Sequence, residues 1–453
     1  MAGIVGVVSD VNCVNDIYYA LRYLTHRAPS DEFYCGIGIG GDNKELHTHQ
    51  GSVSYNYPSE RREKMKGSIG IGAVSGYREP VSELSQHGGL VTCFDGNIIN
   101  YEQVKNTLLQ RGVTFNGYND PDEISDTVLI STIISKQPSF EKGIEELLGM
   151  MKGDFAVVSM NDNGIFAARG YGMKPLIIGK RGDSYIVASE STAFINTEYR
   201  IVRDVNPGEV VHIGKNGIET LKQFDLPVKY GTFEWVYTAY PPSTIDGVNV
   251  ALFRIALGTI VAERNPIEAD LITCVPNSGR WHGIGFYEGY KQVNKVLTRE
   301  VWVRHEDFGR SFTPGTQVQR QETADYKLIP IEEIITGKRI IVVDDSIVRG
   351  TQTSKKIRKL REFGAKEVHV VIECPPLMSA CRYGKTTKND EDCIARRVMQ
   401  DLSQRFQNVT LNMAVDAIQN ELKADSLTYA TAEDIAQASG KPLEKLCLEC
   451  WAA

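Results

Sequence analysis

The stretch that decides the fold of the second half of this chain is RIIVVDDSIVRGTQT, residues 339–353. Its apolar, β-branched run from Ile340 to Val343 predicts a buried strand, which leads straight into the acidic pair Asp344–Asp345. A turn containing Gly350 and several hydroxyl side chains follows, and KKIRKLREFG then predicts a helix. Residues 367–373, EVHVVIE, predict a second strand. The order strand, acidic turn, helix, strand predicts a parallel sheet of the α/β class.

The turn after the first of these strands has the chemistry of a sugar-phosphate site. Ligands of open α/β sheets lie at the carboxyl ends of the strands, which is where this turn falls. A helix N-terminus preceded by glycine and hydroxyls offers N–H groups and the positive end of the helix dipole to a phosphate. The two carboxylates suit a ribose diol, or the cation that develops at its anomeric carbon. A turn that binds no ligand is the alternative, and the combination of acidic pair and Gly/Thr loop argues against it.

Bulk composition bounds the class of protein. The chain has 453 residues, enough for two domains. Its 42% hydrophobic and 24% charged residues are typical of a globular protein, and its net charge of −7 argues against a nucleic-acid surface. No apolar run approaches the roughly 20 residues of a membrane span, and no secretory leader opens the chain. Nine scattered cysteines suit a reducing compartment. We therefore expect a cytoplasmic enzyme without a membrane or nucleic-acid partner.

The pattern of secondary structure changes along the chain. Residues 1–225 contain many short β-branched runs broken by Gly, Asn and Asp, and amphipathic helices are predicted near 13–24, 101–110, 126–136 and 140–149. This pattern predicts two antiparallel sheets packed together and covered by helices. From about residue 248 helices and strands alternate, with helices at 249–263 and 279–291 and strands at 270–275 and 339–343. The predicted domains are 1–230 and 231–453, the second ending in a helical tail.

VVDDSIVRGT resembles the 5-phosphoribosyl-1-pyrophosphate (PRPP) motif of type I phosphoribosyltransferases, in the form found in the amidophosphoribosyltransferase family. The resemblance covers nearly the whole chain, because FAVVSM, AARGYGMKPLIIG, YIVASESTAF and VRDVNPGEVVHI follow the order of that family's class II glutamine amidotransferase domain. ITCVPNSG and GRSF match its pyrophosphate loop and flexible loop. The resemblance implies an α+β N-terminal-nucleophile αββα sandwich followed by an α/β type I phosphoribosyltransferase domain with a parallel sheet.

This resemblance also implies a reaction and the residues that carry it. The reaction is PRPP-dependent phosphoribosyl transfer with release of pyrophosphate, in purine biosynthesis, by a homo-oligomer that uses Mg²⁺. Asp344 and Asp345 would face the ribose hydroxyls and Mg²⁺, and Arg310 would act from a lid formed by 304–312. The 5-phosphate cradle would be Ser346, Ile347, Val348, Arg349, Gly350 and Thr351, and the pyrophosphate loop Asn277, Ser278 and Gly279. A surface role is the alternative for Arg349, and Asn277 stands where the family usually has aspartate.

The amidotransferase half departs from the family at its catalytic positions. Ala2 stands where the family has the cysteine nucleophile, and alanine has no nucleophilic group. Ser75 replaces the arginine that binds the glutamine carboxylate. Asp95 replaces the asparagine of the oxyanion hole, which puts a negative charge where a negative charge would develop. Arg27, Gly96 and Asp126 match the family. A substitution engineered at Ala2 alone is the alternative, but several departures together predict that glutamine hydrolysis has been lost.

Cysteines near the end of the chain suggest a possible cluster. Cys381, Cys447 and Cys450 correspond to three ligands of the structural 4Fe–4S cluster in one branch of the family. The fourth ligand is missing before Phe233, and Cys374 or Cys393 would have to replace it. Spare thiols are the alternative reading.

Three functions follow from these residues. The first is phosphoribosyl transfer to ammonia, giving 5-phosphoribosylamine, with ammonia free or supplied by a separate glutaminase. The second is transfer to a different amine or heterocycle in specialised metabolism. The third is a regulator that binds PRPP or nucleotides without catalysis. Pyrophosphate release with different acceptors distinguishes them.

Overall fold

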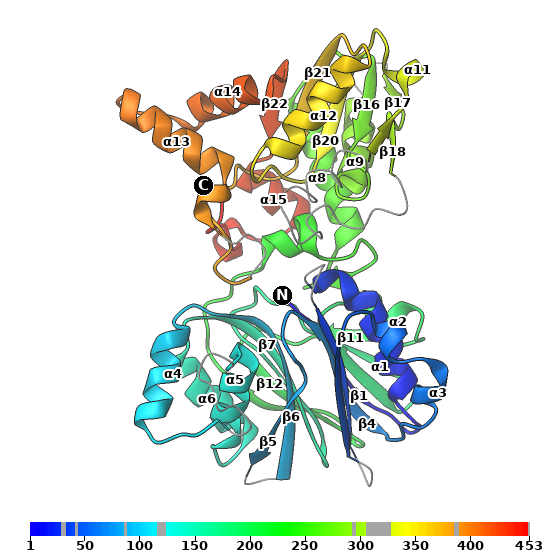
Figure 1. The fold of residues 1–453 in the computed structure, drawn as a ribbon, viewed down its shortest axis with the longest axis vertical. Helices are drawn as coiled ribbons and strands as arrows, with labels where there is room; N and C mark the ends of the chain where they lie inside the picture. Colours follow the sequence, from blue (N-terminus) through cyan, green and yellow to red (C-terminus); the bar gives the residue numbers. More distant parts are fainter. Residues whose placement is uncertain are drawn as a thin grey trace. The chain divides into compact units, whose positions relative to one another are not determined.

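The computed structural model describes residues 1–28, 33–40, 44–85, 88–115, 124–291, 296–304, 328–384 and 389–451. The chain forms two compact units (Figure 1). The first comprises Met1–Gly231, Pro242–Gly247 and Arg382–Lys385, and the second Thr232–Pro241, Val248–Cys381 and Thr386–Ala453. Within the described residues, no helix has both the length and the apolar character needed to cross a membrane.

The first unit is built on two antiparallel sheets, as predicted. One has seven strands in the order β11-β9-β10-β1-β4-β2-β3, and the other has six in the order β13-β12-β8-β7-β6-β5. The strands of the seven-stranded sheet are β1 (Gly3–Val8), β2 (Tyr34–Gly40), β3 (Glu45–Gln50), β4 (Ile69–Ser75), β9 (Ile177–Arg181), β10 (Ser184–Ala188) and β11 (Arg200–Asp204). Those of the six-stranded sheet are β5 (Val81–Ser85), β6 (Gly88–Ile98), β7 (Gly153–Asn161), β8 (Gly164–Arg169), β12 (Glu209–Gly214) and β13 (Gly217–Gln223).

The first unit has four layers, two sheets with helices on either side, and two apolar cores pack these layers together. The first core lies between the sheets, where Ile4 and Ile71 of one sheet join the same cluster as Val158 and Val211 of the other. The second core joins the six-stranded sheet to the helices over its other face. Figure 1 shows α4, α5 and α6 on that face and α1, α2 and α3 beside the seven-stranded sheet. The helices are α1 (Val14–Leu24), α2 (Val53–Asn56), α3 (Ser59–Arg62), α4 (Tyr101–Gln110), α5 (Asp126–Ser135), α6 (Phe140–Met150) and α7 (Thr192–Ile195), with a 3-10 turn η1 (Thr25–Arg27).

The second unit contains the parallel sheet that the alternating pattern predicts. Its five strands have the order β17-β16-β20-β21-β22 and pair in parallel. They are β16 (Leu271–Cys274), β17 (Leu297–Thr298), β20 (Arg339–Asp344), β21 (Glu367–Ile372) and β22 (Ser426–Tyr429). The helices are α8 (Val250–Arg264), α9 (Arg280–Tyr290), α11 (Glu332–Ile335), α12 (Thr351–Glu362), α13 (Ile394–Arg405), α14 (Leu411–Leu422) and α15 (Ala432–Ser439), with the π-helical turn η3 (Glu234–Thr238) and 3-10 turns η4 (Asp390–Asp392) and η5 (Leu443–Lys445). The short strands of this unit are β15 (Val248–Asn249), β18 (Trp302–Arg304) and β19 (Leu328–Pro330), and β14 (Thr244–Ile245) belongs to the first unit.

The sheet register of the second unit brings together loops that are distant in sequence. Cys274 pairs with Val343, and Asp344 pairs with Ile372. Because the strands are parallel, the segments that follow β16 and β20 leave the sheet at the same edge. The loop 275–279 and the acidic pair therefore meet there, although more than 60 residues separate them in the chain.

Candidate active site

The acidic pair lies at the carboxyl edge of the parallel sheet. The apolar residues Ile340 to Val343 bury β20 between β16 and β21, so the strand ends with Asp344 at the edge. Asp344 is 5% exposed and Asp345 is 4% exposed. Two adjacent carboxyl groups at this depth need hydrogen bonds and a positive charge to be stable.

Asp344 has hydrogen-bond donors on both carboxylate oxygens. The Ser278 hydroxyl donates to Oδ1 at 2.9 Å, and the Asp345 N–H donates to the same oxygen at 3.0 Å. The Lys356 ammonium donates to Oδ2 at 2.9 Å from the second turn of α12. Burial opposes ionisation, but the charge of Lys356 and these hydrogen bonds outweigh it, so the pKa of Asp344 lies below its ordinary value.

Asp345 has the opposite electrostatic balance. Its Oδ2 accepts a hydrogen bond from the Ser346 hydroxyl at 2.7 Å. Burial and the neighbouring charge of Asp344 raise the pKa of Asp345 above its ordinary value. The pair thus holds one ionised carboxylate and one carboxyl that keeps its proton to a higher pH than an ordinary aspartate. Carboxylate oxygens are the ligands that Mg²⁺ prefers, so Asp344 and Asp345 fit that ion.

The predicted phosphate cradle connects β20 to α12. Ile347 is buried, and the Val348 carbonyl accepts a hydrogen bond from the Ile394 N–H at 2.8 Å. Gly350 has φ 77°, a left-handed conformation that favours glycine, and it caps α12 ahead of Thr351. The first N–H groups of a helix have no intrahelical acceptor, so those of α12 are free of that ladder next to this loop. Arg349 is exposed and pairs with Asp392 at 2.6 Å, which agrees with the surface reading of its side chain.

The predicted pyrophosphate loop packs directly against the end of β20. A side chain at Gly279 would lie 2.4 Å from the Val343 carbonyl oxygen, so only glycine permits this approach. Asn277 has φ 73°, a conformation that asparagine adopts more readily than most residues. Ser278 between them is the residue that reaches Asp344. Arg310 and residues 305–312 of the expected lid lie outside the described residues.

A second polar cluster lies at the amidotransferase positions of the first unit. Ala2 is 3% exposed, and its backbone N–H donates to Asp95 Oδ1 at 2.8 Å. The Arg27 guanidinium donates to Asp95 Oδ2 at 3.0 Å and to Glu190 Oε1 at 2.7 Å, and its Nε donates to the Ala2 carbonyl. Lys174 Nζ lies 3.8 Å from Asp95 Oδ1. Three of the predicted residues, Ala2, Arg27 and Asp95, are therefore in direct contact.

Both acids of this cluster are ionised. Burial opposes ionisation of Asp95, but the charges of Lys174 and Arg27 hold its pKa below the ordinary value. Burial also opposes ionisation of Glu190, yet His26 and Arg27 lower its pKa to about 2. The second oxygen of Glu190 accepts a hydrogen bond from the Ser243 hydroxyl at 2.8 Å. The cluster is a fully buried ion network with a methyl group at its edge.

The remaining predicted residues lie on neighbouring elements. Gly3 pairs with Val74, which places Ala2 beside the end of β4, where Ser75 lies. The Ser75 hydroxyl accepts a hydrogen bond from the Tyr77 N–H at 3.2 Å. A side chain at Gly96 would lie 2.3 Å from the Asp154 carbonyl oxygen, so glycine is required for packing there. Asp126 is the first residue of α5 and is buried.

Glu79 is a buried acid next to this network that the sequence did not single out. Its carboxyl accepts hydrogen bonds from the Thr127 hydroxyl and, at 3.3 Å, from the Phe94 N–H. Burial raises the pKa of Glu79 to about 7, and the charge of Asp95 acts in the same direction. Because the folded protein binds this proton more tightly than the unfolded chain, the protonated acid favours folding, and stability falls as pH rises from about 4.5 to about 7.

Replacing Glu79 by glutamine is expected to remove this pH dependence. Between pH 5 and pH 8, the free energy of unfolding of the native protein should fall on the order of 2 kcal/mol more than that of Glu79→Gln. Urea titrations at several pH values measure the difference. Glu102→Gln, at an exposed residue of α4, is the matched control and should leave the pH profile unchanged. If the free energy of unfolding changed with pH in the same way for the native protein and Glu79→Gln, Glu79 would not be the source of the pH dependence.

The cysteines do not form the expected cluster site. The described residues contain no group of three or more His, Cys, Asp or Glu side chains placed to hold a metal ion, so Cys381, Cys447 and Cys450 are not a ligand set here. All the cysteines are free thiols. The prediction of a 4Fe–4S cluster does not fit these residues.

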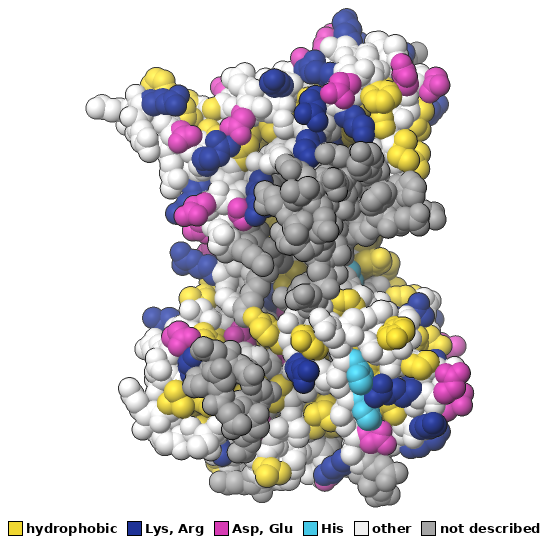
Figure 2. All heavy atoms as spheres, viewed as in Figure 1, with side chains coloured by type: hydrophobic (Ala, Val, Ile, Leu, Met, Phe, Trp, Pro, Cys, Tyr) yellow, Lys and Arg dark blue, Asp and Glu magenta, His cyan; other side chains and the backbone are white. Residues whose placement is uncertain are grey.

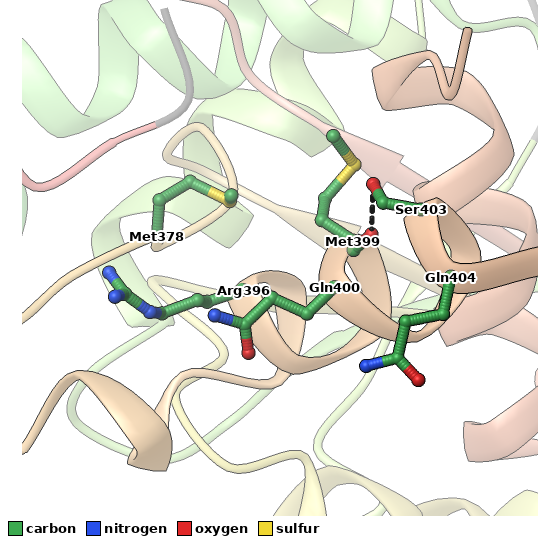
Figure 3. Close-up of a pocket in the computed structure, with 6 residues that line it drawn as sticks. All are labelled: Met378, Arg396, Met399, Gln400, Ser403 and Gln404. Atoms are coloured by element: carbon green, nitrogen blue, oxygen red, sulfur yellow. Dashed lines mark hydrogen bonds between the residues drawn. The ribbon is translucent and has the colours of Figure 1, made fainter. Parts of the chain in front are cut away.

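A surface hollow of about 550 Å³ lies along α13 (Figure 3). Its lining is Met378, Arg396, Met399, Gln400, Ser403 and Gln404. Figure 3 shows the Arg396, Gln400 and Gln404 side chains extending from one side of the helix. None of the predicted site residues lines it, and its open, flexible amides and methionines lack the convergent polar groups of a catalytic site.

Three charged residues of these sites were not predicted from the sequence. Lys356 could have been found from helix phase, because it lies at the edge of the buried face of α12, beside Leu360 and Thr353. Lys174 and Glu190 offered no local signal. Each comes to the network through a loop whose position depends on the packed sheets.

Comparison with known proteins agrees with this arrangement. A family model described as a glutamine amidotransferase domain matches residues 68–196. The amidophosphoribosyltransferase of Bacillus subtilis is 30% identical over 471 residues, covering 99% of this chain and 92% of the relative, and that of Methanocaldococcus jannaschii is 29% identical, covering 99% and 96%. A solved structure of the B. subtilis glutamine PRPP amidotransferase, complexed with ADP and GMP, has a TM-score of 0.86 at 29% identity, covering 99% of this chain and 96% of the other. The predicted fold, an amidotransferase-like sandwich followed by a phosphoribosyltransferase domain, is confirmed.

Proposed function

Because the chain belongs to the amidophosphoribosyltransferase family, we propose that it transfers the 5-phosphoribosyl group of PRPP to ammonia without hydrolysing glutamine. The members of this family are pentosyltransferases of purine synthesis that act on PRPP. The proposed absence of glutamine hydrolysis rests on the ion network at Ala2. A methyl group and the Asp95 carboxylate take the places of a thiol and an oxyanion donor.

The geometry of the acidic pair supports the transfer step. In the reaction, the bond between C1 of the ribose and the pyrophosphate oxygen breaks, a bond from C1 to the ammonia nitrogen forms, and the nitrogen loses a proton. Ser278 and Lys356 fix the Asp344 carboxylate, which would accept a hydrogen bond from a ribose hydroxyl and stabilise the cationic sugar. The N–H groups at the start of α12 suit the 5-phosphate. A bound Mg²⁺ would supply further charge neutralisation for the pyrophosphate.

The ion network argues against glutamine hydrolysis on chemical grounds. Ala2 has no group that can attack an amide, so no covalent intermediate can form there. The Asp95 carboxylate is ionised and accepts the Ala2 N–H, so it would repel the oxyanion of a glutamine intermediate. Ammonia would therefore come from solution or from a separate glutaminase.

Pyrophosphate release from PRPP tests this function. With Mg²⁺ and an ammonium salt above pH 8, we expect steady pyrophosphate release and formation of 5-phosphoribosylamine. With glutamine as the sole nitrogen source, we expect release no faster than the hydrolysis of PRPP without an acceptor. Glutamine-supported turnover would contradict the loss of glutaminase activity. Turnover only with another amine would assign a different acceptor, and PRPP binding without any turnover would favour a regulator.

Restoring the nucleophile alone should not restore glutamine use. Ala2→Cys places a thiol at the edge of the network while the Asp95 carboxylate stays in place. We expect no glutamine hydrolysis by Ala2→Cys, measured as glutamate formation, and unchanged activity with ammonia. Glutamate formation at a rate comparable to the ammonia reaction would show that Ala2 is the only defect.

A further inference from the structure

We infer that Lys356 is a built-in counter-ion of the PRPP site, a positioning residue that fixes the Asp344 carboxylate and supplies part of the charge neutralisation that Mg²⁺ would otherwise provide. The inference rests on the proposed function and extends it to the metal requirement of the same site.

Lys356 is less exposed than Arg358 and Arg361, the two exposed basic residues of α12. α12 contains Lys355, Lys356, Arg358, Lys359 and Arg361. Figure 2 shows Lys and Arg side chains gathered over this part of the second unit, and Arg358 is 69% exposed beside Glu362. The Lys356 side chain is only 18% exposed, and its ammonium lies 2.9 Å from Asp344 Oδ2. Helical phase explains the difference, because Thr353, Ile357 and Leu360 are the buried residues and Lys356 adjoins them.

The contact leaves Asp344 in one defined orientation. The Ser278 hydroxyl and the Asp345 N–H donate hydrogen bonds to Oδ1, and the Lys356 ammonium donates to Oδ2. A carboxylate has about four lone-pair directions, so about one direction remains for a ribose hydroxyl. The carboxylate cannot rotate without losing a charge-assisted hydrogen bond. Lys356 therefore acts on PRPP through Asp344 rather than by touching the reacting carbon.

Charge balance gives Lys356 its second role. Two adjacent buried carboxyl groups carry up to two negative charges, and Lys356 places a positive charge 2.9 Å from Asp344 Oδ2. A pair without a counter-ion would repel the pyrophosphate and phosphate groups of PRPP unless a metal ion neutralised it. With Lys356 present, PRPP should bind measurably even when divalent cations are removed.

PRPP binding with and without Mg²⁺ tests this inference by calorimetry. In EDTA, Lys356→Met should bind PRPP about tenfold or more weakly than the native protein, since it loses a charge-assisted hydrogen bond. Saturating Mg²⁺ should reduce this difference in PRPP affinity between Lys356→Met and the native protein. Lys356→Arg keeps the charge and should stay within about threefold of the native protein. Arg358→Met, on the exposed side of α12, is the matched control and should bind normally. In assays with ammonia, Lys356→Met should raise KM for PRPP more than it lowers kcat.

The outcomes separate this inference from the function it extends. Native protein that binds no PRPP under either condition rejects the proposed function. Native protein that binds PRPP only when Mg²⁺ is present overturns the inference alone. Equal affinity of Lys356→Met and the native protein in EDTA also overturns it, provided that circular dichroism and thermal melting show the variant to be folded.

Discussion

Asp344→Asn is expected to lower kcat/KM for PRPP-dependent transfer to ammonia by about a thousandfold. The substitution keeps the shape of the side chain but removes the negative charge that would face the sugar under the proposed function. It also leaves the Lys356 ammonium, now 2.9 Å from a neutral group, without its partner. The site changes from one that stabilises a developing cation to one that repels it. Steady-state pyrophosphate release over a range of PRPP concentrations measures the loss.

Asp270→Asn is the matched control for this prediction. Asp270 precedes β16 at the opposite, amino edge of the same sheet, where it pairs with Arg339 at 2.9 Å. Asp270→Asn should keep kcat/KM within about twofold of the native value, because ligands bind at the carboxyl edge of such a sheet. Retention of more than a tenth of the activity by Asp344→Asn would show that Asp344 is not the carboxylate that stabilises the sugar.

Arg27→Met is expected to lower the free energy of unfolding by about 3–5 kcal/mol. Arg27 is fully buried and bridges Asp95 and Glu190, and its removal leaves both carboxylates short of positive charge. Methionine fills much of the volume, so the loss measures uncompensated charge rather than a cavity. Chemical denaturation at pH 7, followed by tryptophan fluorescence and circular dichroism, gives the difference.

Two further variants show whether the loss has this cause. Arg27→Met with Asp95→Asn should be more stable than Arg27→Met alone, because the second change removes one of the unpaired charges. Arg111→Met breaks a solvent-exposed pair with Glu146 and should cost less than about 1 kcal/mol. A loss at Arg27 no larger than the loss at Arg111 would mean that the network contributes little to stability.

Much of the second unit could be predicted from local pattern. The run Ile340 to Val343 is apolar on consecutive positions, as expected for a strand buried on both faces, and the helix after it has its apolar residues at helical spacing. Given a parallel sheet, the rule that ligands bind at the carboxyl edge brings the 275–279 loop to Asp344 without any further information. The contact between Ser278 and Asp344 is the result.

The ion pairs could not be predicted in the same way. Arg27 and Glu190 are 163 residues apart, and their contact depends on how a turn after α1 meets the end of β10. The spacing of apolar residues in the sequence does not predict such a contact, because the contact depends on where the side chains lie after the sheets have packed. The cysteine prediction failed for a related reason. Spacing suggested three ligands, whereas the described residues contain no group of three or more His, Cys, Asp or Glu side chains placed to hold a metal ion.

The buried network around Ala2 has an evolutionary consequence. Arg27 and Lys174 both pair with Asp95, and Arg27 also pairs with Glu190, so the fold of the first unit depends on these buried charges. Under the proposed function, cysteine at position 2 gains nothing while Asp95 remains, and a loss of Asp95 alone leaves Arg27 with one carboxylate fewer. If glutaminase activity has been lost, each single substitution back is therefore neutral or destabilising, and the stability of the fold opposes its return.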